Sequence, residues 1–239
     1  MKAIFFDRGD TLVQFGEPDY EAGLKEIRAS MAPAKTLDSA ALRQFHEAFL
    51  KKIDSYREHS NIEVNALHYY ELLARYFGIQ FNRPYEEICR RYHLAAQRFS
   101  PLPGAPQVLD ELKRRGFLLG LVTNTFLPHS VIAAEFKTLA LYDYFDTVVC
   151  SSEIIFRKPD RMIFEVALRS LTASASEALF VGDDYYADIA GAKEVGMKTV
   201  WLNPRRVAVA GEVKPDYEIV ELKEILKFTE SNAGGSPVK

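Results

Sequence analysis

The sequence lacks the features that mark several classes of protein. It contains only two cysteines, Cys89 and Cys150, among 239 residues, too few for a disulfide framework or a cysteine-based metal cluster. The first apolar run ends at Asp7, far too early for a secretory signal, and no run approaches the roughly 20 apolar residues that span a bilayer. The formal net charge of -3 gives no electrostatic reason to expect a nucleic acid or an acidic membrane surface as partner. We therefore expect a cytoplasmic protein with two buried thiols and with no nucleic-acid or membrane partner.

The sequence does have the composition of a folded globular protein. Hydrophobic residues make up 48% of it and charged residues 26%, close to the averages for soluble domains. Its length allows one large domain or a domain with an insertion.

Short apolar runs predict a parallel sheet. They do not alternate with polar residues, so we interpret them as strands buried on both faces. The five runs are residues 3–6, 117–122, 147–149, 178–181 and 199–202. Amphipathic segments such as PQVLDELKRRG and PDRMIFEVALRS lie between the later runs and predict helices. Alternating strands and helices indicate an α/β fold with a Rossmann-like, doubly wound parallel sheet.

The spacing of the runs predicts an insertion. More than a hundred residues separate the first run from the second, which is far longer than loops inside compact domains. This interval holds four helical patterns, at residues 19–31, 38–59, 64–77 and 84–99. We expect a core of residues 1–15 and 100–230, an inserted four-helix domain at residues 16–99, and a disordered tail at 231–239. Residues 100–106 form the expected return hinge.

Polar residues follow the predicted strands. Asp7 comes directly after the first, Thr123 follows the second, Asp183 and Asp184 follow the fourth, and Lys158 precedes the helix after the third. Because ligands of open α/β sheets bind at the carboxyl ends of the strands, we expect these side chains to share one crevice. An aspartate, a hydroxyl, an ammonium and an acidic pair there outline a phosphoryl-transfer site.

Each of these groups has a chemical task in such a reaction. A carboxylate such as Asp7 can attack phosphorus to give an aspartyl-phosphate. Asp7 and Asp183 are a natural ligand pair for Mg²⁺, which would shield the nucleophile from the phosphate charge. Thr123 and Lys158 could hold the phosphoryl oxygens in the transition state, and Asp188 could orient Lys158 or a metal-bound water.

Four motifs resemble those of a known family. DRGDTL, LVTN, RKP and GDDYYADIAGAKEVG are similar, in order and spacing, to the motifs of the haloacid dehalogenase (HAD) superfamily, whose members are mostly phosphatases. The resemblance extends to about Phe228. The position of the insertion resembles subfamily I, in which an α-helical cap between the first two motifs closes over the site and selects the substrate.

The resemblance implies a role for each motif residue. It makes Asp7 the nucleophile, Thr123 and Lys158 the phosphate ligands, Asp183 a Mg²⁺ ligand and Asp188 its support. Asn124, next to Thr123 in the LVTN motif, is a further candidate for the phosphate site.

The sequence departs from the family at one position. Family phosphatases usually carry a second aspartate two residues after the nucleophile, which protonates the leaving group and then activates water; here that residue is Gly9. The Gly9 carbonyl can still bind Mg²⁺, as it does in the family, but acid–base help worth roughly 10² to 10⁴-fold has no evident donor. Asp10 follows at once. Either it takes over proton transfer, or its side chain bonds to the backbone of the turn.

Three functions remain open after this departure. The first is a phosphatase that is slow, or that needs good leaving groups such as acyl or aryl phosphates. The second is carbon-centred or phosphonate chemistry, as in the metal-free dehalogenases or the phosphonatases, whose Schiff-base lysine would be Lys51 or Lys52. The third is a degenerate protein that binds a phosphorylated ligand or a partner without turnover. Clustering Asp183 and Asp184 beside Asp7 without a cation would be costly, which argues against a dehalogenase.

We therefore predict a Mg²⁺-dependent phosphohydrolase that acts on a small phosphorylated metabolite, as a monomer or homodimer. Arg8 could bind an anionic substrate group or pair with Asp10. Either Asp183 or Asp184 could cap the following helix. The aromatic and basic residues of the insertion, at helical spacing, are interpreted as core or solvated face; they are Tyr56, Arg57, His59, His68, Tyr69 and Tyr70. Arg205 and Arg206 are interpreted as surface charge.

Overall fold

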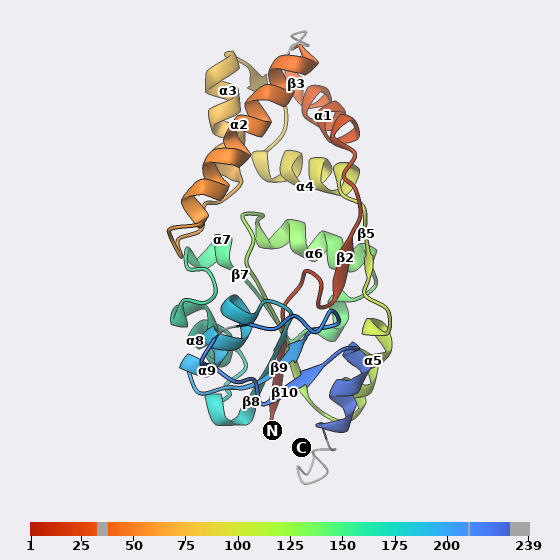
Figure 1. Ribbon diagram of the computed structural model, residues 1–239. Helices are drawn as coiled ribbons and strands as arrows, with labels where there is room; N and C mark the ends of the chain where they lie inside the picture. The colour runs from red at the N-terminus through yellow and green to blue at the C-terminus, as the bar shows by residue number, and fades with distance from the viewer. Residues whose placement is uncertain (33–37, 210, 230–239) are drawn as a thin grey trace.

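The computed structural model describes residues 1–32, 38–209 and 211–229 (Figure 1). The tail predicted to be disordered, residues 231–239, lies outside them. A six-stranded sheet with the order β10-β9-β8-β1-β6-β7 forms the core, and all its neighbouring strands are parallel. Its strands are β1 (Ala3–Phe6), β6 (Leu118–Thr123), β7 (Thr147–Cys150), β8 (Ala178–Gly182), β9 (Lys198–Leu202) and β10 (Tyr217–Ile219).

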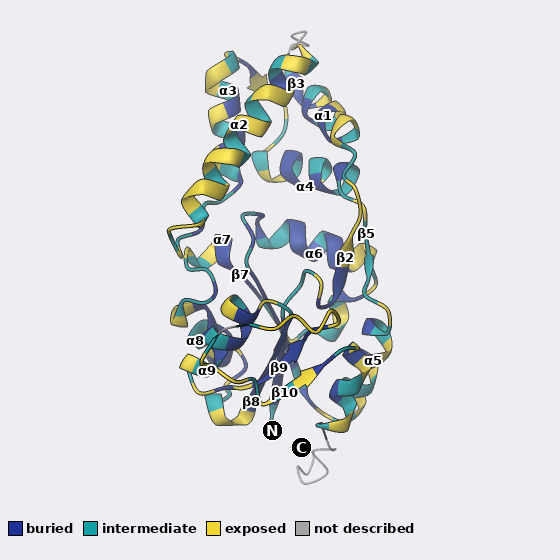
Figure 2. Ribbon diagram, viewed as in Figure 1, coloured by how far each residue is buried: buried dark blue, intermediate teal, exposed yellow. Residues whose placement is uncertain are grey.

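Helices cover both faces of this sheet, which confirms the predicted doubly wound α/β core. Ile4 and Phe6 of β1 belong to the buried cluster that includes side chains of α5 and α6. Ala3 and Phe5 point the other way and pack with α8 and α9. The bounds are α5 (Ala105–Arg114), α6 (His129–Thr138), α8 (Arg161–Ser170) and α9 (Gly191–Glu194). The strands accordingly lie buried between helices whose outer faces are exposed (Figure 2).

The sequence pattern missed several short elements. The edge strand β10 has three residues and buries only Ile219, so it leaves no apolar run. A short helix, α7 (Ser151–Ile154), follows β7, and a π-helix, η3 (Tyr185–Ala190), follows β8. Brief 3-10 helices lie at η1 (Tyr142–Tyr144), η2 (Ala175–Glu177) and η4 (Leu222–Lys227).

The long interval after β1 contains the four expected helices. Asp19 and Asp38 cap the first two by accepting hydrogen bonds from backbone N–H groups. The helices are α1 (Tyr20–Ala29), α2 (Ser39–Arg57), α3 (Leu67–Phe77) and α4 (Tyr85–Ala96). The antiparallel strands β2 (Val13–Phe15) and β5 (Phe99–Pro101) connect them to the core, and β3 (Met31–Ala32) pairs with β4 (Gln80–Phe81) among them. The four helices lie together at one end of the molecule (Figure 1).

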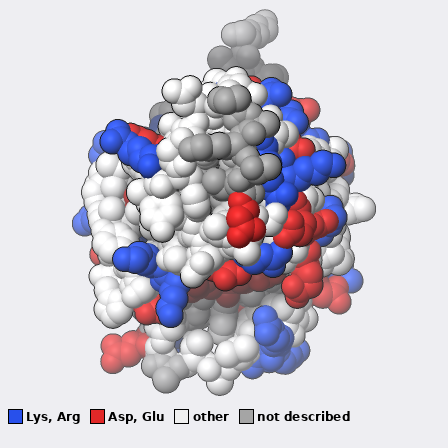
Figure 3. All heavy atoms as spheres, turned by 90° about the horizontal axis from the view of Figure 1, so that it is seen from above, with Lys and Arg blue, Asp and Glu red and all other residues white. Residues whose placement is uncertain are grey.

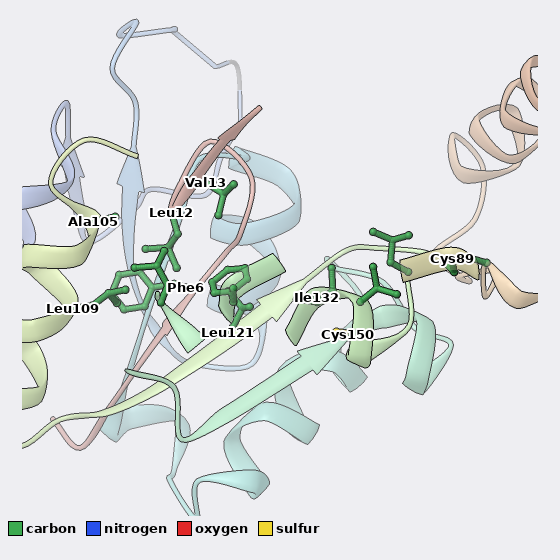
Figure 4. Close-up of a cluster of buried hydrophobic side chains, with 14 of the residues drawn as sticks. Phe6, Leu12, Val13, Cys89, Ala105, Leu109, Leu121, Ile132 and Cys150 are labelled. Atoms are coloured by element: carbon green, nitrogen blue, oxygen red, sulfur yellow. The ribbon is translucent and has the colours of Figure 1, made fainter. Parts of the chain in front are cut away.

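The inserted helices pack on the core through α4 and α6. Cys89 of α4, Ile132 of α6 and Cys150 of β7 belong to one buried cluster (Figure 4). Both thiols are buried, as expected, and burial raises their pKa to about 12.

The end of the molecule that carries the helices has charges of both signs interspersed on its surface (Figure 3). Of the described helices, none has the length and apolar content that crossing a bilayer requires.

Candidate active site

The strand order brings the predicted site residues to one edge of the sheet. β1 lies between β6 and β8, so the residues that follow these three strands are neighbours. Asp7 is fixed there by a 2.9 Å hydrogen bond from its backbone N–H to the carbonyl of Val181 on β8. Thr123, at the end of β6, is buried. Within the described part of the chain its hydroxyl has no hydrogen-bond partner, which leaves it available to a ligand.

Lys158 joins two of the carboxylates. Its Nζ lies 2.5 Å from Oδ1 of Asp7, 2.7 Å from Oδ1 of Asp188 and 3.0 Å from the carbonyl of Val122. Burial alone would lower the pKa of Lys158, but the charges of Asp188 and Asp7 outweigh it, and the pKa is raised. The lysine therefore stays protonated and offsets part of the negative charge around it.

The carboxylates form a compact acidic cluster. Oxygen atoms of Asp7, Asp183 and Asp188 all lie within 4.8 Å of one another. Burial, followed by the repulsion of Asp7, raises the pKa of Asp183 to about 6. The Thr11 hydroxyl, which sequence reasoning missed, donates a 3.0 Å hydrogen bond to Oδ1 of Asp183 and orients it. Hard oxygen donors that repel one another are the ligand set that suits Mg²⁺.

Asp188 depends on Gly182 for its place. A Cβ atom added at Gly182 would lie 2.1 Å from Oδ2 of Asp188, far inside contact distance. The same Oδ2 accepts a 3.1 Å hydrogen bond from the backbone N–H of Asp184. Burial raises the pKa of Asp188, and Lys158 opposes that rise. Only a glycine at the end of β8 lets the carboxylate reach Lys158.

Asp184 caps the segment that follows. Its Oδ1 accepts hydrogen bonds from the N–H groups of Tyr186, at 2.8 Å, and Ala187, at 2.9 Å, at the start of η3. Of the two capping candidates, Asp184 is therefore the cap, and Asp183 is left to the acidic cluster.

The side chain of Asn124 forms two hydrogen bonds with the backbone of Lys158. Its Nδ2 donates to the Lys158 carbonyl at 2.9 Å, and its Oδ1 accepts from the Lys158 N–H at 2.7 Å. In this structure the predicted phosphate ligand therefore serves to position Lys158.

The loop after Asp7 closes on itself around Gly9. The Arg8 carbonyl accepts hydrogen bonds from the N–H groups of Leu12 and Val13, and the N–H of Asp10 donates to the Val13 carbonyl. These bonds do not use the carbonyl of Gly9. A Cβ atom added at Gly9 would meet only the Phe15 ring, at 3.7 Å, an ordinary contact.

Asp10 does not make the turn bond expected of it. Its backbone has a left-handed φ of 51° and its side chain is exposed. Within the described residues the carboxylate has no hydrogen-bond partner, so only the Asp10 backbone closes the loop. It also lies outside the cluster of Asp7, Asp183 and Asp188.

Arg8 pairs with Glu135 of α6 rather than with Asp10. Its Nε donates to Oε1 of Glu135 at 2.7 Å, its Nη2 contacts Oε2, and Nε2 of His93 on α4 lies 2.6 Å from that same Oε2. Burial alone would raise the pKa of Glu135, but His93 and Arg8 outweigh it and lower the pKa. This buried group connects the loop after Asp7 to both the core and the inserted helices.

The comparison with protein families decides the family. The model of the haloacid dehalogenase-like hydrolases matches residues 1–196. The chain belongs to this family of hydrolases.

Several members of the family resemble the chain over much of its length. It is 30% identical over 241 residues to glyceraldehyde 3-phosphate phosphatase of Pyrococcus furiosus, covering 98% of this chain and 95% of that one. It is 31% identical over 164 residues to (S)-2-haloacid dehalogenase of Pseudomonas sp. (strain YL), covering 67% of each chain. The crystal structure of an HAD phosphatase from Thermococcus onnurineus superposes with a TM-score of 0.62 at 28% identity and covers both chains completely.

A cavity of about 370 Å³ lies between the core of this HAD-like hydrolase and its inserted helices. Asp7 and Lys158 are not in its wall, but the residues beside them, Arg8 and Arg157, are, together with Asn124. Aromatic residues supply much of the rest of the wall: Phe15, Tyr20, Phe49, Tyr69, Tyr70, Tyr92 and Phe126.

Sequence reasoning named Arg8 and Asn124 but left the other cavity residues out. Of the residues interpreted as core or solvated face, Arg57, Tyr69 and Tyr70 line the cavity, whereas Tyr56, His59 and His68 are exposed. The sequence offered one indication that Arg157 lies near the site, because this residue directly precedes Lys158 in the RKP motif. Arg205 and Arg206 are exposed, as expected.

Proposed function

We propose that this HAD-like hydrolase is a Mg²⁺-dependent phosphatase that cleaves a small phosphate monoester through an aspartyl-phosphate on Asp7. The observation that carries the proposal is the contact of Asp7 with Lys158 inside the cluster that Asp183 and Asp188 complete. A nucleophile, a cation for the phosphoryl oxygens and ligands for a metal then lie within one site. The phosphatase from Pyrococcus furiosus, similar over the whole chain, supports this choice.

The acidic cluster is the proposed place of the metal. The carboxylates of Asp7 and Asp183 and the carbonyl of Gly9 would hold Mg²⁺, with Asp188 supporting them. Bound there, the ion would neutralise charge on the phosphoryl oxygens and on the attacking carboxylate.

In the first chemical step, a carboxylate oxygen of Asp7 attacks phosphorus, and the bond from phosphorus to the leaving oxygen breaks. The ammonium of Lys158 and the hydroxyl of Thr123 donate hydrogen bonds to the phosphoryl oxygens, where charge spreads in the transition state. Asp188 and Asn124 keep Lys158 in place. Because position 9 has no side chain that could donate a proton, the leaving group departs as an oxyanion.

In the second step, water attacks the phosphorus of the aspartyl-phosphate. The bond to the Asp7 oxygen breaks, inorganic phosphate is released, and the carboxylate is restored. The attacking water loses its proton to solvent, because position 9 has no side chain to receive it, so this step is slow in the absence of an aspartate there. We expect the aspartyl-phosphate to accumulate.

The helices α1–α4 are the proposed cap, residues 16–99, of a core formed by residues 1–15 and 100–230. The cavity at the junction would hold the part of the substrate that leaves.

The alternative chemistries have less support. A metal-free dehalogenase would have only Lys158 to offset the burial and the repulsion by Asp7 that raise the pKa of Asp183. Lys51 and Lys52 on α2 are exposed, whereas a Schiff-base lysine is normally activated in a desolvated pocket or beside another cation.

Phosphate release from aryl, acyl and alkyl phosphates, measured with Mg²⁺ and with a chelator, tests the proposal. The wild type is compared with Asp7→Asn and with Asp110→Asn, a matched change at an exposed position of α5. We expect release that needs Mg²⁺, is lost in Asp7→Asn and persists in Asp110→Asn. Release by Asp7→Asn at a substantial rate would remove Asp7 as nucleophile, and no release from any compound would favour a binding protein.

A further inference from the structure

Arg157 is a cationic residue of the cavity wall, and two nitrogen atoms of its guanidinium group have unused hydrogen-bond donors. Its Nε and Nη1 are buried and have no hydrogen-bond partner among the described residues. Buried donors of this kind are costly, and they are normally matched by an acceptor. The side chain is 20% exposed and lines the cavity directly beside Lys158, so a small turn of the guanidinium group would bring these donors to an acceptor on a ligand in the cavity.

The neighbouring carboxylate does not fill this need. Oε1 of Glu63 accepts from Nη2 of Arg57 at 2.8 Å, and Oε2 accepts from the Ser151 hydroxyl at 3.0 Å. Arg157 Nε lies 3.4 Å from Oε2, an ion pair whose geometry does not make a hydrogen bond. Two guanidinium groups thus share one buried carboxylate. The other nearby acid, Asp54, is 68% exposed and 3.4 Å from Arg57, and water screens it.

Another part of the wall is aromatic and uncharged. His46 lies 3.2 Å from the hydroxyl of Tyr69 and 3.2 Å from that of Tyr92, so the polar ends of both tyrosines are occupied and their rings are left as wall. Burial lowers the pKa of His46 to about 4, which keeps it neutral at pH 7. Such a wall favours a flat apolar group, because aromatic rings pack well against one another.

The glycine at position 9 restricts which leaving groups can depart, and this restriction does not depend on the cavity wall. Without a proton donor at that position, the leaving oxygen must carry its negative charge unaided. A phenol has a pKa of about 10, whereas an alkoxide is about as basic as the hydroxide of water, whose pKa is about 16. An aryl oxide therefore leaves far more readily than an alkoxide.

Together these observations define a substrate class. We propose that the substrate is the phosphate monoester of a phenolic alcohol that carries an anionic substituent, with Arg157 binding the anion and the aromatic wall holding the ring. This inference rests on the phosphatase proposed above. In this inference Arg157 determines substrate specificity, whereas Asp7 is the nucleophile for every substrate.

Steady-state kinetics with five compounds tests the proposal. They are phenyl phosphate, 3-carboxyphenyl phosphate, 4-carboxyphenyl phosphate, uridine 5′-monophosphate and glyceraldehyde 3-phosphate. Uridine 5′-monophosphate keeps an aromatic ring but has an alkyl leaving oxygen, so it separates ring binding from leaving-group chemistry. We expect phenyl phosphate to exceed both alkyl phosphates in kcat/KM by about a hundredfold or more. The better carboxyphenyl phosphate should exceed phenyl phosphate by about tenfold or more, as for a hydrogen bond to a charged group.

Two variants assign the carboxylate preference to its residue. In Arg157→Gln the ratio of carboxyphenyl to phenyl phosphate should fall to near one. It should stay at the wild-type value in Arg161→Gln, which changes an exposed arginine of α8 paired with Glu165. Arg157→Lys, which keeps the charge but not the planar fork, should retain part of the preference. Two different variants at position 157 keep the assignment testable if one of them does not fold, and a wild-type ratio near one overturns it without any variant.

The outcomes separate this inference from the phosphatase itself. A wild-type ratio near one, or a ratio unchanged in Arg157→Gln, would overturn the role of Arg157. Alkyl phosphates cleaved as fast as phenyl phosphate would overturn the aryl leaving group. In both cases, release that is lost in Asp7→Asn leaves the phosphatase standing. No release from any of the five compounds would overturn the inference and count against the phosphatase as well.

Discussion

A Cβ atom on Gly182 would lie 2.1 Å from Oδ2 of Asp188, so the glycine at the end of β8 makes room for the carboxylate that holds Lys158. Gly182→Ala should push Asp188 away from Lys158. We expect at least a tenfold loss of kcat, about 1.4 kcal/mol of transition-state stabilisation, together with a lower melting temperature.

Gly9→Ala is the matched control, because a Cβ atom at Gly9 meets only the Phe15 ring at 3.7 Å. Its melting temperature should stay close to that of the wild type. Equal melting temperatures and rates in the two variants would show that Asp188 moves aside freely.

An aspartate at position 9 should supply the missing acid and base. The site has space for the side chain, and the φ angle of Gly9 is one that other residues adopt. We expect Gly9→Asp to raise kcat/KM for alkyl phosphates by about 10² or more, the usual worth of general acid catalysis, and to raise it less for aryl phosphates. Gly9→Asn, which has the shape but no exchangeable acid, should not produce this gain. If Gly9→Asp cleaves alkyl phosphates no faster than the wild type does, the missing carboxylate is not what limits the enzyme.

Asp10 should contribute little to turnover. Its carboxylate is exposed and lies outside the acidic cluster, so we expect Asp10→Asn to cost less than about tenfold in kcat/KM. The pH–rate profiles of wild type and variant check this. If the Asp10 carboxylate transfers protons, the variant should lose one of the two limbs of the profile. A larger loss at unchanged melting temperature would mean that Asp10 has replaced the aspartate absent from position 9.

The Glu135 carboxylate should stabilise the fold in a pH-dependent way. His93 and Arg8 lower its pKa below the usual value of 4.5, so the folded state binds protons less readily than the unfolded state. The stabilisation is therefore present above about pH 4.5 and is lost as the pH falls through the lowered value. Glu135→Gln leaves Arg8 without its buried partner and should cost about 3–5 kcal/mol at neutral pH.

Denaturant titrations of wild type and Glu135→Gln from neutral pH downward measure this difference, which should shrink in acid. Glu71→Gln, which breaks the exposed pair with Arg75 on α3, is the control and should cost about 1 kcal/mol or less. A difference that stays constant with pH would mean that the charge of Glu135 does not contribute.

The sequence predicted the core and the centre of the site because their signals are local. Buried parallel strands appear as apolar runs, and Asp7, Thr123 and Asp183 lie where those runs end. The rule that ligands bind at the carboxyl ends of the strands then places these residues in one crevice. The short strand β10 escaped prediction because one buried residue leaves no pattern.

Other features depend on tertiary contacts that no local pattern encodes. Glu135 lies 127 residues from Arg8, and nothing near either of them indicates their pairing. The left-handed backbone of Asp10 decides where its carboxylate points, and an aspartate in a turn can adopt either hand. Amphipathic spacing places Tyr69 and Tyr70 on the inner face of α3 but cannot tell a packed core from a cavity wall.

The measurement that tests the central claim most directly is the detection of phosphate bound to Asp7. Wild-type protein mixed with phenyl phosphate and Mg²⁺ is quenched in acid within the first turnovers, and its peptides are analysed by mass spectrometry. We predict a phosphoryl group on the peptide that contains Asp7, absent in Asp7→Asn and less abundant in Gly9→Asp, which should hydrolyse it faster. Turnover by the wild type with no phosphoryl group on that peptide at any time would contradict the aspartyl-phosphate mechanism.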